Sequence, residues 1–279
     1  MRVPLALVLL ILLLGCTGTG GRSMSSSSSE NCSVARDAAL AASLSSARIL
    51  FGHQSVGGNI LRGLEEITAP VGGIPLREWD PSAADLPRGI LHFRVGTNGD
   101  PASKIRSFEK MFASAPAAEL DAAGFKFCFD DFDGRTDVRE LFGAYEQAVT
   151  RIHEGFPRLR IYHLTVPPTT RDSKARRVAK WLLRRPSSFR LNRDREAFNR
   201  LLRAHFGDDG LLFDLAALEA EVSPAAAMGM KKGGVLYLSS RFTDDGAHLN
   251  ETGRRIIACR WMSFLAGLVS PPSSEEESR

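Results

Sequence analysis

The sequence lacks the patterns that assign many chains to a class at once. It has only four cysteines in 279 residues, and neither a Cys-x-x-Cys nor a His-x-x-x-His spacing, the patterns typical of zinc sites. His53, His92 and His163 fall near expected strand ends, but no spacing joins them with His248 into a zinc site. No internal repeat is visible. We therefore expect no metal and no other cofactor.

The chain also lacks a long apolar run, and its N-terminus has the pattern of a signal peptide. Residues 3–14 are apolar except for Pro4, which is too short a run to span a membrane. The run ends in Leu13-Leu14-Gly15-Cys16, which resembles a bacterial lipobox. We expect residues 1–15 to be removed and Cys16 to carry lipid; a plain secretory signal or an uncleaved anchor is the alternative. The chain is then exported and lipid-anchored to the cell envelope, on its periplasmic or surface side, which argues against nucleic acid as a partner.

Two flanking segments are too polar to build a core. Residues 16–34 are rich in Gly and Ser and predict a flexible tether, and residues 269–279 predict a polar tail. With Cys16 lipidated in an oxidising compartment, three cysteines remain. Cys128 lies in an apolar pattern and is expected to be a core thiol. A Cys32–Cys259 bridge would join the two ends of the domain, and the sequence does not decide whether it forms.

Net charge is small but unevenly distributed. The formal charge is +4, whereas residues 171–195 hold ten basic and two acidic residues, a net charge of +8. The rest of the chain is therefore −4. The basic stretch fits a solvated helix face, or contact with an anionic polymer or lipid headgroups, with Trp181, Leu182 and Leu183 as an apolar patch.

Strand patterns alternate with helical patterns through residues 35–268, a length suited to one domain. Strands are predicted at 48–51, 91–95, 125–129, 160–166, 211–215 and 235–238, and helices at 35–46, 56–66, 104–113, 138–153, 178–185, 194–206 and 253–268. Such alternation implies a mostly parallel sheet covered on both faces, a three-layer α/β/α sandwich. Ligands bind at the carboxyl ends of the strands in such folds.

Two distant segments each carry part of a hydrolytic site. Ser55 follows a strand and begins a helix, where a serine is either a plain N-cap or a nucleophile beside the N–H groups of the helix. Asp245 lies three residues before His248, a spacing at which the carboxylate reaches the imidazole and orients it. Asp244 competes for that role. Asn250 serves as a helix cap in the alternative interpretation.

In this order the segments resemble the SGNH (GDSL-like) hydrolases. Asp245-x-x-His248, with Leu249-Asn250 after it, is similar to the last motif of that family, and Thr97-Asn98-Gly99-Asp100 is similar to its second motif. The resemblance spans residues 48–268 and implies a flavodoxin-like fold. It also implies that Ser55 is the nucleophile, that His248 and Asp245 are base and acid, and that the N–H groups of Ser55 and Gly99 bind the oxyanion.

Two motifs depart from the family. The first usually reads Gly-Asp-Ser and here reads His53-Gln54-Ser55, while the third usually supplies an Asn and here reads Asp130-Asp131-Phe132-Asp133. A carboxylate is a poor oxyanion donor. Either Asn98 or Asn59 supplies the missing donor, or Asp131 binds a sugar hydroxyl, or turnover is weak or lost.

The function we expect is that of a serine esterase. Its substrates would be O-acyl esters, on small molecules or on cell-envelope or extracellular polysaccharide. The alternatives are a non-catalytic carbohydrate- or surface-binding protein on the same scaffold, and an O-acyltransferase that uses the same three side chains.

Overall fold

The computed structural model describes residues 34–270 except 81, 83–84, 114 and 231–233. The predicted signal peptide, the lipidation site Cys16, most of the tether and nearly all of the polar tail lie outside the described residues. Among the described helices, none has both the length and the apolar character needed to cross a bilayer.

A row of parallel strands forms the middle of the domain. The main sheet has the order β2-β3-β1-β4-β5, and a second pair joins β6 to β7. These strands are β1 (Arg48–His53), β2 (Leu76–Glu78), β3 (Gly89–Arg94), β4 (Ala122–Phe125), β5 (Arg160–Ile161), β6 (His163–Leu164) and β7 (Leu212–Phe213). Only Tyr162 separates β5 from β6, and its N–H donates to Ala123 O of β4 at 2.9 Å. The second pair therefore continues the main sheet.

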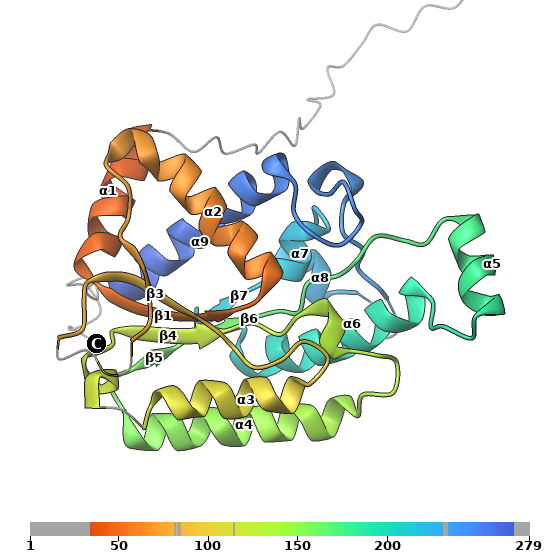
Figure 1. Cartoon of the computed structure of the whole chain (residues 1–279), viewed down its shortest axis with the longest axis horizontal. Helices are drawn as coiled ribbons and strands as arrows, with labels where there is room; N and C mark the ends of the chain where they lie inside the picture. The colour runs from red at the N-terminus through yellow and green to blue at the C-terminus, as the bar shows by residue number, and fades with distance from the viewer. Residues whose placement is uncertain (1–33, 81, 83–84, 114, 231–233, 271–279) are drawn as a thin grey trace, which may run out of the picture. The chain divides into compact units, whose positions relative to one another are not determined.

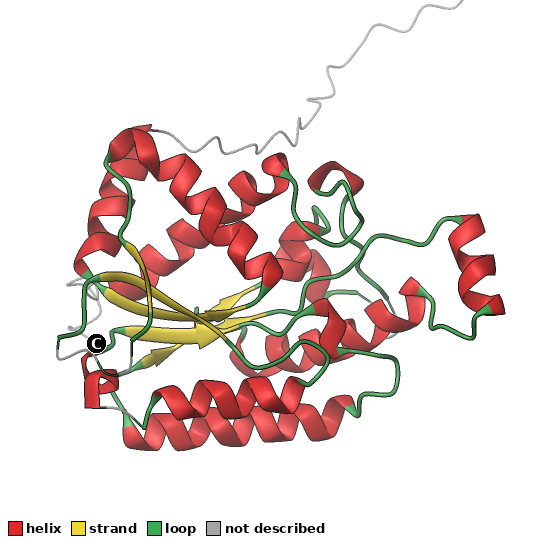
Figure 2. Cartoon of the chain, in the orientation of Figure 1, coloured by secondary structure: helices red, strands yellow, loops and turns green. Residues whose placement is uncertain are grey.

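Helices cover both faces of the sheet (Figures 1 and 2). One face packs against α1 (Val34–Ser46), α2 (Ser55–Thr68) and α9 (Glu251–Val269), and the other against α3 (Pro101–Met111), α4 (Val138–Gly155) and α6 (Ser188–Phe206). The shorter helices are α5 (Lys174–Leu182), α7 (Leu215–Glu219) and α8 (Pro224–Met228). The predicted α/β/α sandwich with a parallel sheet is confirmed.

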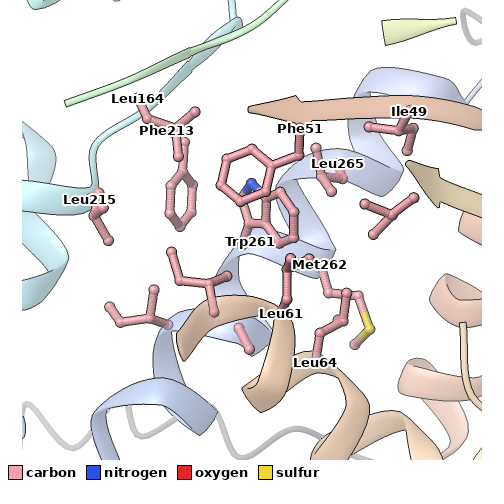
Figure 3. Packing of buried hydrophobic residues seen from close by; sticks show 14 of the residues in the cluster. Ile49, Phe51, Leu61, Leu64, Leu164, Phe213, Leu215, Trp261, Met262 and Leu265 are labelled. Carbon is pink, nitrogen blue, oxygen red and sulfur yellow. The ribbon is translucent and has the colours of Figure 1, made fainter. Parts of the chain in front are cut away.

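The central strand β1 shows why the sequence folds in this way. Ile49, Leu50 and Phe51 are fully buried, as expected for a strand covered on both faces. Phe51 packs on Trp261 of α9, with ring centroids 4.7 Å apart (Figure 3), while Leu50 faces the other helix layer. A Cβ on Gly63 of α2 would lie 2.3 Å from Arg254 O, so glycine is required where α2 and α9 meet.

Several element boundaries differ from those predicted. The strand predicted at 125–129 ends at Phe125, because Asp131 accepts the Cys128 N–H and turns the chain out of the sheet. The strand predicted at 211–215 is shorter, because Asp214 caps α7. Residues 235–238 form no strand; Leu238 N–H donates to Thr169 O of a loop at 3.3 Å. The helix predicted at 178–185 lies earlier, at Lys174–Leu182.

The described cysteines differ in state. Cys128 is buried and is a free thiol, which confirms the predicted core position. Cys259 of α9 is disulfide-bonded. The partner considered for it, Cys32, lies outside the described residues.

Candidate active site

Ser55 is the first residue of α2, directly after the carboxyl end of β1, and it is half-buried. The N-cap position belongs to Gln54, so the interpretation of Ser55 as a plain N-cap is wrong. Gln54 makes no side-chain cap; its amide donates instead to Val95 O at 3.0 Å and Gly96 O at 2.8 Å. The first-turn N–H groups of α2 therefore have no capping side chain, and a helix N-terminus in that state favours a negative charge.

Asp245 and His248 form a close pair in the loop before α9. Asp245 Oδ2 lies 2.6 Å from His248 Nδ1, while Oδ1 accepts the backbone N–H groups of Ala247 and His248, each at 2.8 Å. Burial alone would raise the pKa of Asp245, but the hydrogen bonds from His248 and Ala247 outweigh it and hold that pKa well below its usual range. The carboxylate is thus ionised and accepts the hydrogen of Nδ1, which leaves Nε2 as the ring nitrogen that can accept a proton.

Asp244, the competing acid, faces elsewhere. Its Oδ1 accepts Asn250 Nδ2 at 3.2 Å, while Asn250 Oδ1 accepts the Gly253 N–H and caps α9. The structure therefore pairs the imidazole with Asp245.

A contact between α2 and the histidine loop brings the two halves of the site together. Asn59 lies one helical turn after Ser55, so both side chains share one face of α2. Asn59 Oδ1 accepts the N–H of Leu249, the residue after His248, at 3.3 Å. The imidazole also packs edge-on against Phe129, with ring centroids 5.5 Å apart. Segments almost 200 residues apart thereby meet at the carboxyl edge of the sheet.

Asp131 is buried, and both of its carboxylate oxygens accept hydrogen bonds from within the protein. Its Oδ1 accepts the Gly99 N–H at 3.0 Å, and its Oδ2 accepts Lys104 Nζ and the Cys128 N–H, both at 2.7 Å. The Lys104 and Asp131 side chains are both 0% exposed. The carboxylate thus joins two loops at the sheet edge to α3, and neither oxygen is left for a sugar hydroxyl.

This network changes how the predicted oxyanion donors are engaged. The Gly99 N–H points at Asp131, not outward. Asn98 Oδ1 accepts Lys104 Nζ at 3.0 Å, so the Nδ2 group is the half of its amide that can donate to a substrate. Asn59 uses its oxygen on the histidine loop. The Asn98 loop lies beside Ser55, because Gln54 holds Gly96.

A pair of histidines lies beneath the site. His53 Nε2 is 3.3 Å from His92 Nδ1, and His53 Nδ1 is 3.1 Å from Gln54 O. Burial lowers the pKa of His53 to about 4, so it is neutral at pH 7. His163 lies apart in the core and bonds the Tyr145 hydroxyl at 2.7 Å. The described residues contain no group of three or more His, Cys, Asp or Glu side chains placed to hold a metal.

Sequence reasoning missed the buried charges that support the site. Lys104 has a signal in retrospect, because it shares a helical face with the buried Ile105 and Phe108. Glu219 is buried with neither carboxylate oxygen hydrogen-bonded within the described chain, and burial raises its pKa to about 8. Lys126, also buried, donates to Phe127 O at 3.2 Å. Nothing in the sequence pattern marks either of these two residues as buried.

Comparisons with known proteins give structural similarity at low sequence identity. No family model and no curated protein matches this sequence. A protein of Parabacteroides merdae described as a GDSL-like lipase is 17% identical, with a TM-score of 0.46 over 80% of this chain and 96% of its own. A family 3 carbohydrate esterase of Talaromyces cellulolyticus is 14% identical, with a TM-score of 0.43 over 80% and 98%. An acetyl esterase mutant with acetate ion is 13% identical, with a TM-score of 0.42 over 80% and 98%. At these values the similarity identifies no substrate for this chain.

Proposed function

We propose that the chain is a serine ester hydrolase with Ser55 as nucleophile, His248 as base and Asp245 as the orienting acid. One observation carries this proposal: the 2.6 Å Asp245–His248 pair is joined through Leu249 to the helix that begins with Ser55. Acyl transfer of this kind needs three groups: a serine at a helix N-terminus, an imidazole with one ring nitrogen left to accept a proton, and a carboxylate that orients the imidazole and stabilises the imidazolium.

The reaction follows from the roles of these atoms. His248 Nε2 takes the proton of Ser55 Oγ as Oγ attacks the ester carbonyl carbon. The imidazolium, stabilised by Asp245, then gives that proton to the departing alkoxide, which leaves as the alcohol. Water, deprotonated by the same imidazole, attacks the carbonyl carbon of the acyl-serine; the bond to Ser55 Oγ then breaks, the imidazolium returns the proton to Oγ, and the acid is released. No cofactor takes part in these steps.

For the oxyanion we propose the first-turn N–H groups of α2, starting with that of Ser55, together with Asn98 Nδ2. The first group has no capping side chain, and the second belongs to an exposed amide whose oxygen is held by Lys104. Gly99 acts indirectly, because its N–H holds the loop against Asp131. Removing one such donor typically lowers turnover about 100- to 1,000-fold, so Asn98→Ala is expected to fall in that range.

We further propose that the substrates are O-acyl esters on cell-envelope or extracellular polysaccharide.

We also propose that the protein is exported and anchored through lipid on Cys16. Support for the location comes from the N-terminal sequence pattern alone. Membrane fractionation of cells tests it: Cys16→Ala is expected to move the protein into the soluble fraction. Unchanged membrane association would contradict the anchor.

Hydrolysis of a chromogenic acetyl ester tests the reaction. Ser55→Ala is expected to lower kcat on the order of 1,000-fold or more, whereas Ser46→Ala, at an exposed serine of α1, leaves it unchanged. A fluorophosphonate is expected to label Ser55, and the adduct is expected to be lost in His248→Ala. Equal rates in wild type and Ser55→Ala would end the esterase proposal.

A binding protein without catalysis is the second candidate, and the occupied Gly99 N–H favours it, since it removes one expected oxyanion donor. The phosphonate adduct in wild type distinguishes the two candidates. A binding protein would retain affinity for acetylated polysaccharide in Ser55→Ala and would show no phosphonate adduct in wild type.

A further inference from the structure

Helix α5 stands apart from both helix layers and buries none of its residues (Figure 1). A nine-residue helix is marginal in water by itself, and most helices are stabilised by packing an apolar face. Here the N-cap Ser173 and the ion pair of Lys180 with Asp172 at 2.9 Å hold it in place. The helix therefore has an apolar face without a partner in the described chain.

Exposed apolar side chains are concentrated on this segment. Within the described residues six large hydrophobic side chains are exposed, and five of them lie between 178 and 189. Trp181 is 76% exposed, Leu182 66% and Val178 58%. Positions 178, 181 and 182 are spaced i, i+3 and i+4, so these three side chains share one face of α5.

Basic side chains surround that face. The segment from 171 to 195 has a net charge of +8, and its basic residues are Arg171, Lys174, Arg176, Arg177, Lys180, Arg184, Arg185, Arg190, Arg193 and Arg195. On α5 and in the turn after it, Lys174, Arg176, Arg177, Arg184 and Arg185 are exposed and form no ion pair within the described part of the chain. Directly after the helix, Arg184 has φ 52°, a conformation that usually holds glycine, and the Arg184 and Arg185 N–H groups donate to Trp181 O and Lys180 O of the last turn.

We propose that α5 docks onto an anionic lipid bilayer, with Val178, Trp181 and Leu182 inserted among the lipids and the basic side chains at the headgroups. Apolar residues with Trp on one face and Lys or Arg around it are the composition of helices that lie in a membrane interface. A second copy that binds through its own α5 is a poor occupant, because two segments of +8 repel one another.

The docking site adjoins the candidate active site. The segment leaves the body of the domain at Thr170, whose N–H donates to Gly246 O at 2.9 Å, in the loop that carries Asp245 and His248. A Cβ on Gly246 would lie 3.8 Å from Arg176 of α5. A bilayer bound to α5 thus holds that loop near the lipid surface, while the docking itself is independent of the proposed esterase reaction.

Tryptophan fluorescence tests the proposal on the full-length, non-lipidated chain, because lipid on Cys16 would bind vesicles by itself. Trp181 is exposed, whereas Trp79 and Trp261 are 7% and 0% exposed. With phosphatidylglycerol-containing vesicles, the emission is expected to shift to the blue and to be quenched by brominated acyl chains. Both signals are expected to disappear in Trp181→Phe. Pure phosphatidylcholine vesicles, or 0.5 M salt, are expected to weaken binding at least tenfold.

Charge-matched variants distinguish docking through α5 from a general electrostatic attraction of the whole protein to the membrane. Arg184→Glu/Arg185→Glu is expected to weaken vesicle binding at least tenfold. Arg139→Glu/Arg158→Glu, with the same change in charge at exposed positions away from α5, is expected to leave binding within about twofold. Absence of quenching by brominated lipid in wild type would overturn the proposal. So would protection of Trp181 by soluble dextran sulfate without any lipid quenching, because the partner would then be an anionic polymer.

Discussion

Removal of the Asp131 carboxylate is expected to destabilise the protein far more than removal of an equally short surface ion pair. In Asp131→Ala, Lys104 Nζ keeps one acceptor, Asn98 Oδ1, and stays inside a fully buried site. Breaking a buried pair by deleting one partner costs about 3–5 kcal/mol, and the buried Cys128 N–H loses its acceptor at about 1–3 kcal/mol more. Since domains are stable by about 5–15 kcal/mol, the variant is expected to be marginally folded.

The matched control is the surface pair of Arg151 and Glu109, which has the same 2.7 Å separation but side chains 56% and 27% exposed. Glu109→Ala is expected to cost less than about 1 kcal/mol, because water solvates the Arg151 guanidinium that remains. Urea unfolding at pH 7, followed by far-UV circular dichroism, measures both variants. Asp131→Ala with a free energy of unfolding within 1 kcal/mol of wild type would refute the reasoning.

A double variant separates the charge from the shape of the site. Lys104→Met/Asp131→Leu removes both charges and retains volume, a replacement that is often neutral or stabilising for a buried pair. It is expected to be more stable than Asp131→Ala, though it still leaves the Gly99 and Cys128 N–H groups without this acceptor. A double variant no more stable than Asp131→Ala would contradict the view that the unpaired buried ammonium is the main cost of the single substitution.

Three further outcomes are expected. Asp245→Asn is expected to lower kcat on the order of 10,000-fold, because the imidazole loses its orienting acceptor; chromogenic ester hydrolysis measures it, and a loss below tenfold would contradict the assigned role. Glu219→Gln replaces a carboxyl whose pKa burial raises to about 8 with an uncharged side chain of similar shape. Because the unfolded chain ionises Glu219 at a lower pH than the folded chain does, wild type is expected to lose stability relative to this variant as pH rises from 4.5 to 8, and the difference is expected to stay constant above pH 8. Urea unfolding at pH 5, 7 and 9 measures this difference. Gly63→Ala, whose Cβ would lie 2.3 Å from Arg254 O, is expected to lower the free energy of unfolding by about 1–3 kcal/mol. Gly143→Ala, at a position in α4 with open space around it, is expected to raise it by up to about 1 kcal/mol. Equal effects of the two substitutions would contradict the close packing of α2 on α9.

Alternating strand and helix patterns were enough to predict the layers, because a buried parallel strand such as residues 49–51 reads as a continuous apolar run. Strand ends were less predictable. Residues 127–129 are as apolar as β4 itself, yet they leave the sheet because Asp131, three residues after Cys128, accepts the Cys128 N–H. Periodicity within a strand contains no information about a side chain that will compete for its backbone.

Residue spacing likewise predicted part of the site. Asp245 and His248 are three residues apart, so a local pattern is sufficient to predict their 2.6 Å contact. By contrast, the Gly99 N–H donates to Asp131, 32 residues away, and the Leu249 N–H donates to Asn59, 190 residues away. Contacts between distant segments are set by the packing of whole helices on the sheet, which a single sequence does not reveal.

Asp131 and Asp245 show why the residue type alone does not assign a role. Both are aspartates that follow the sheet and accept two or more N–H groups, and both were candidate site residues. The Asp131 side chain is 0% exposed and forms a buried ion pair with the Lys104 ammonium. The Asp245 side chain is 56% exposed and pairs with the His248 imidazole, whose charge can change during a reaction. Because an ammonium group cannot take up a further proton whereas a neutral imidazole can, only the second carboxylate can stabilise a charge that develops during proton transfer. The partner and its burial, and not the aspartate, decide which of the two belongs to the chemistry.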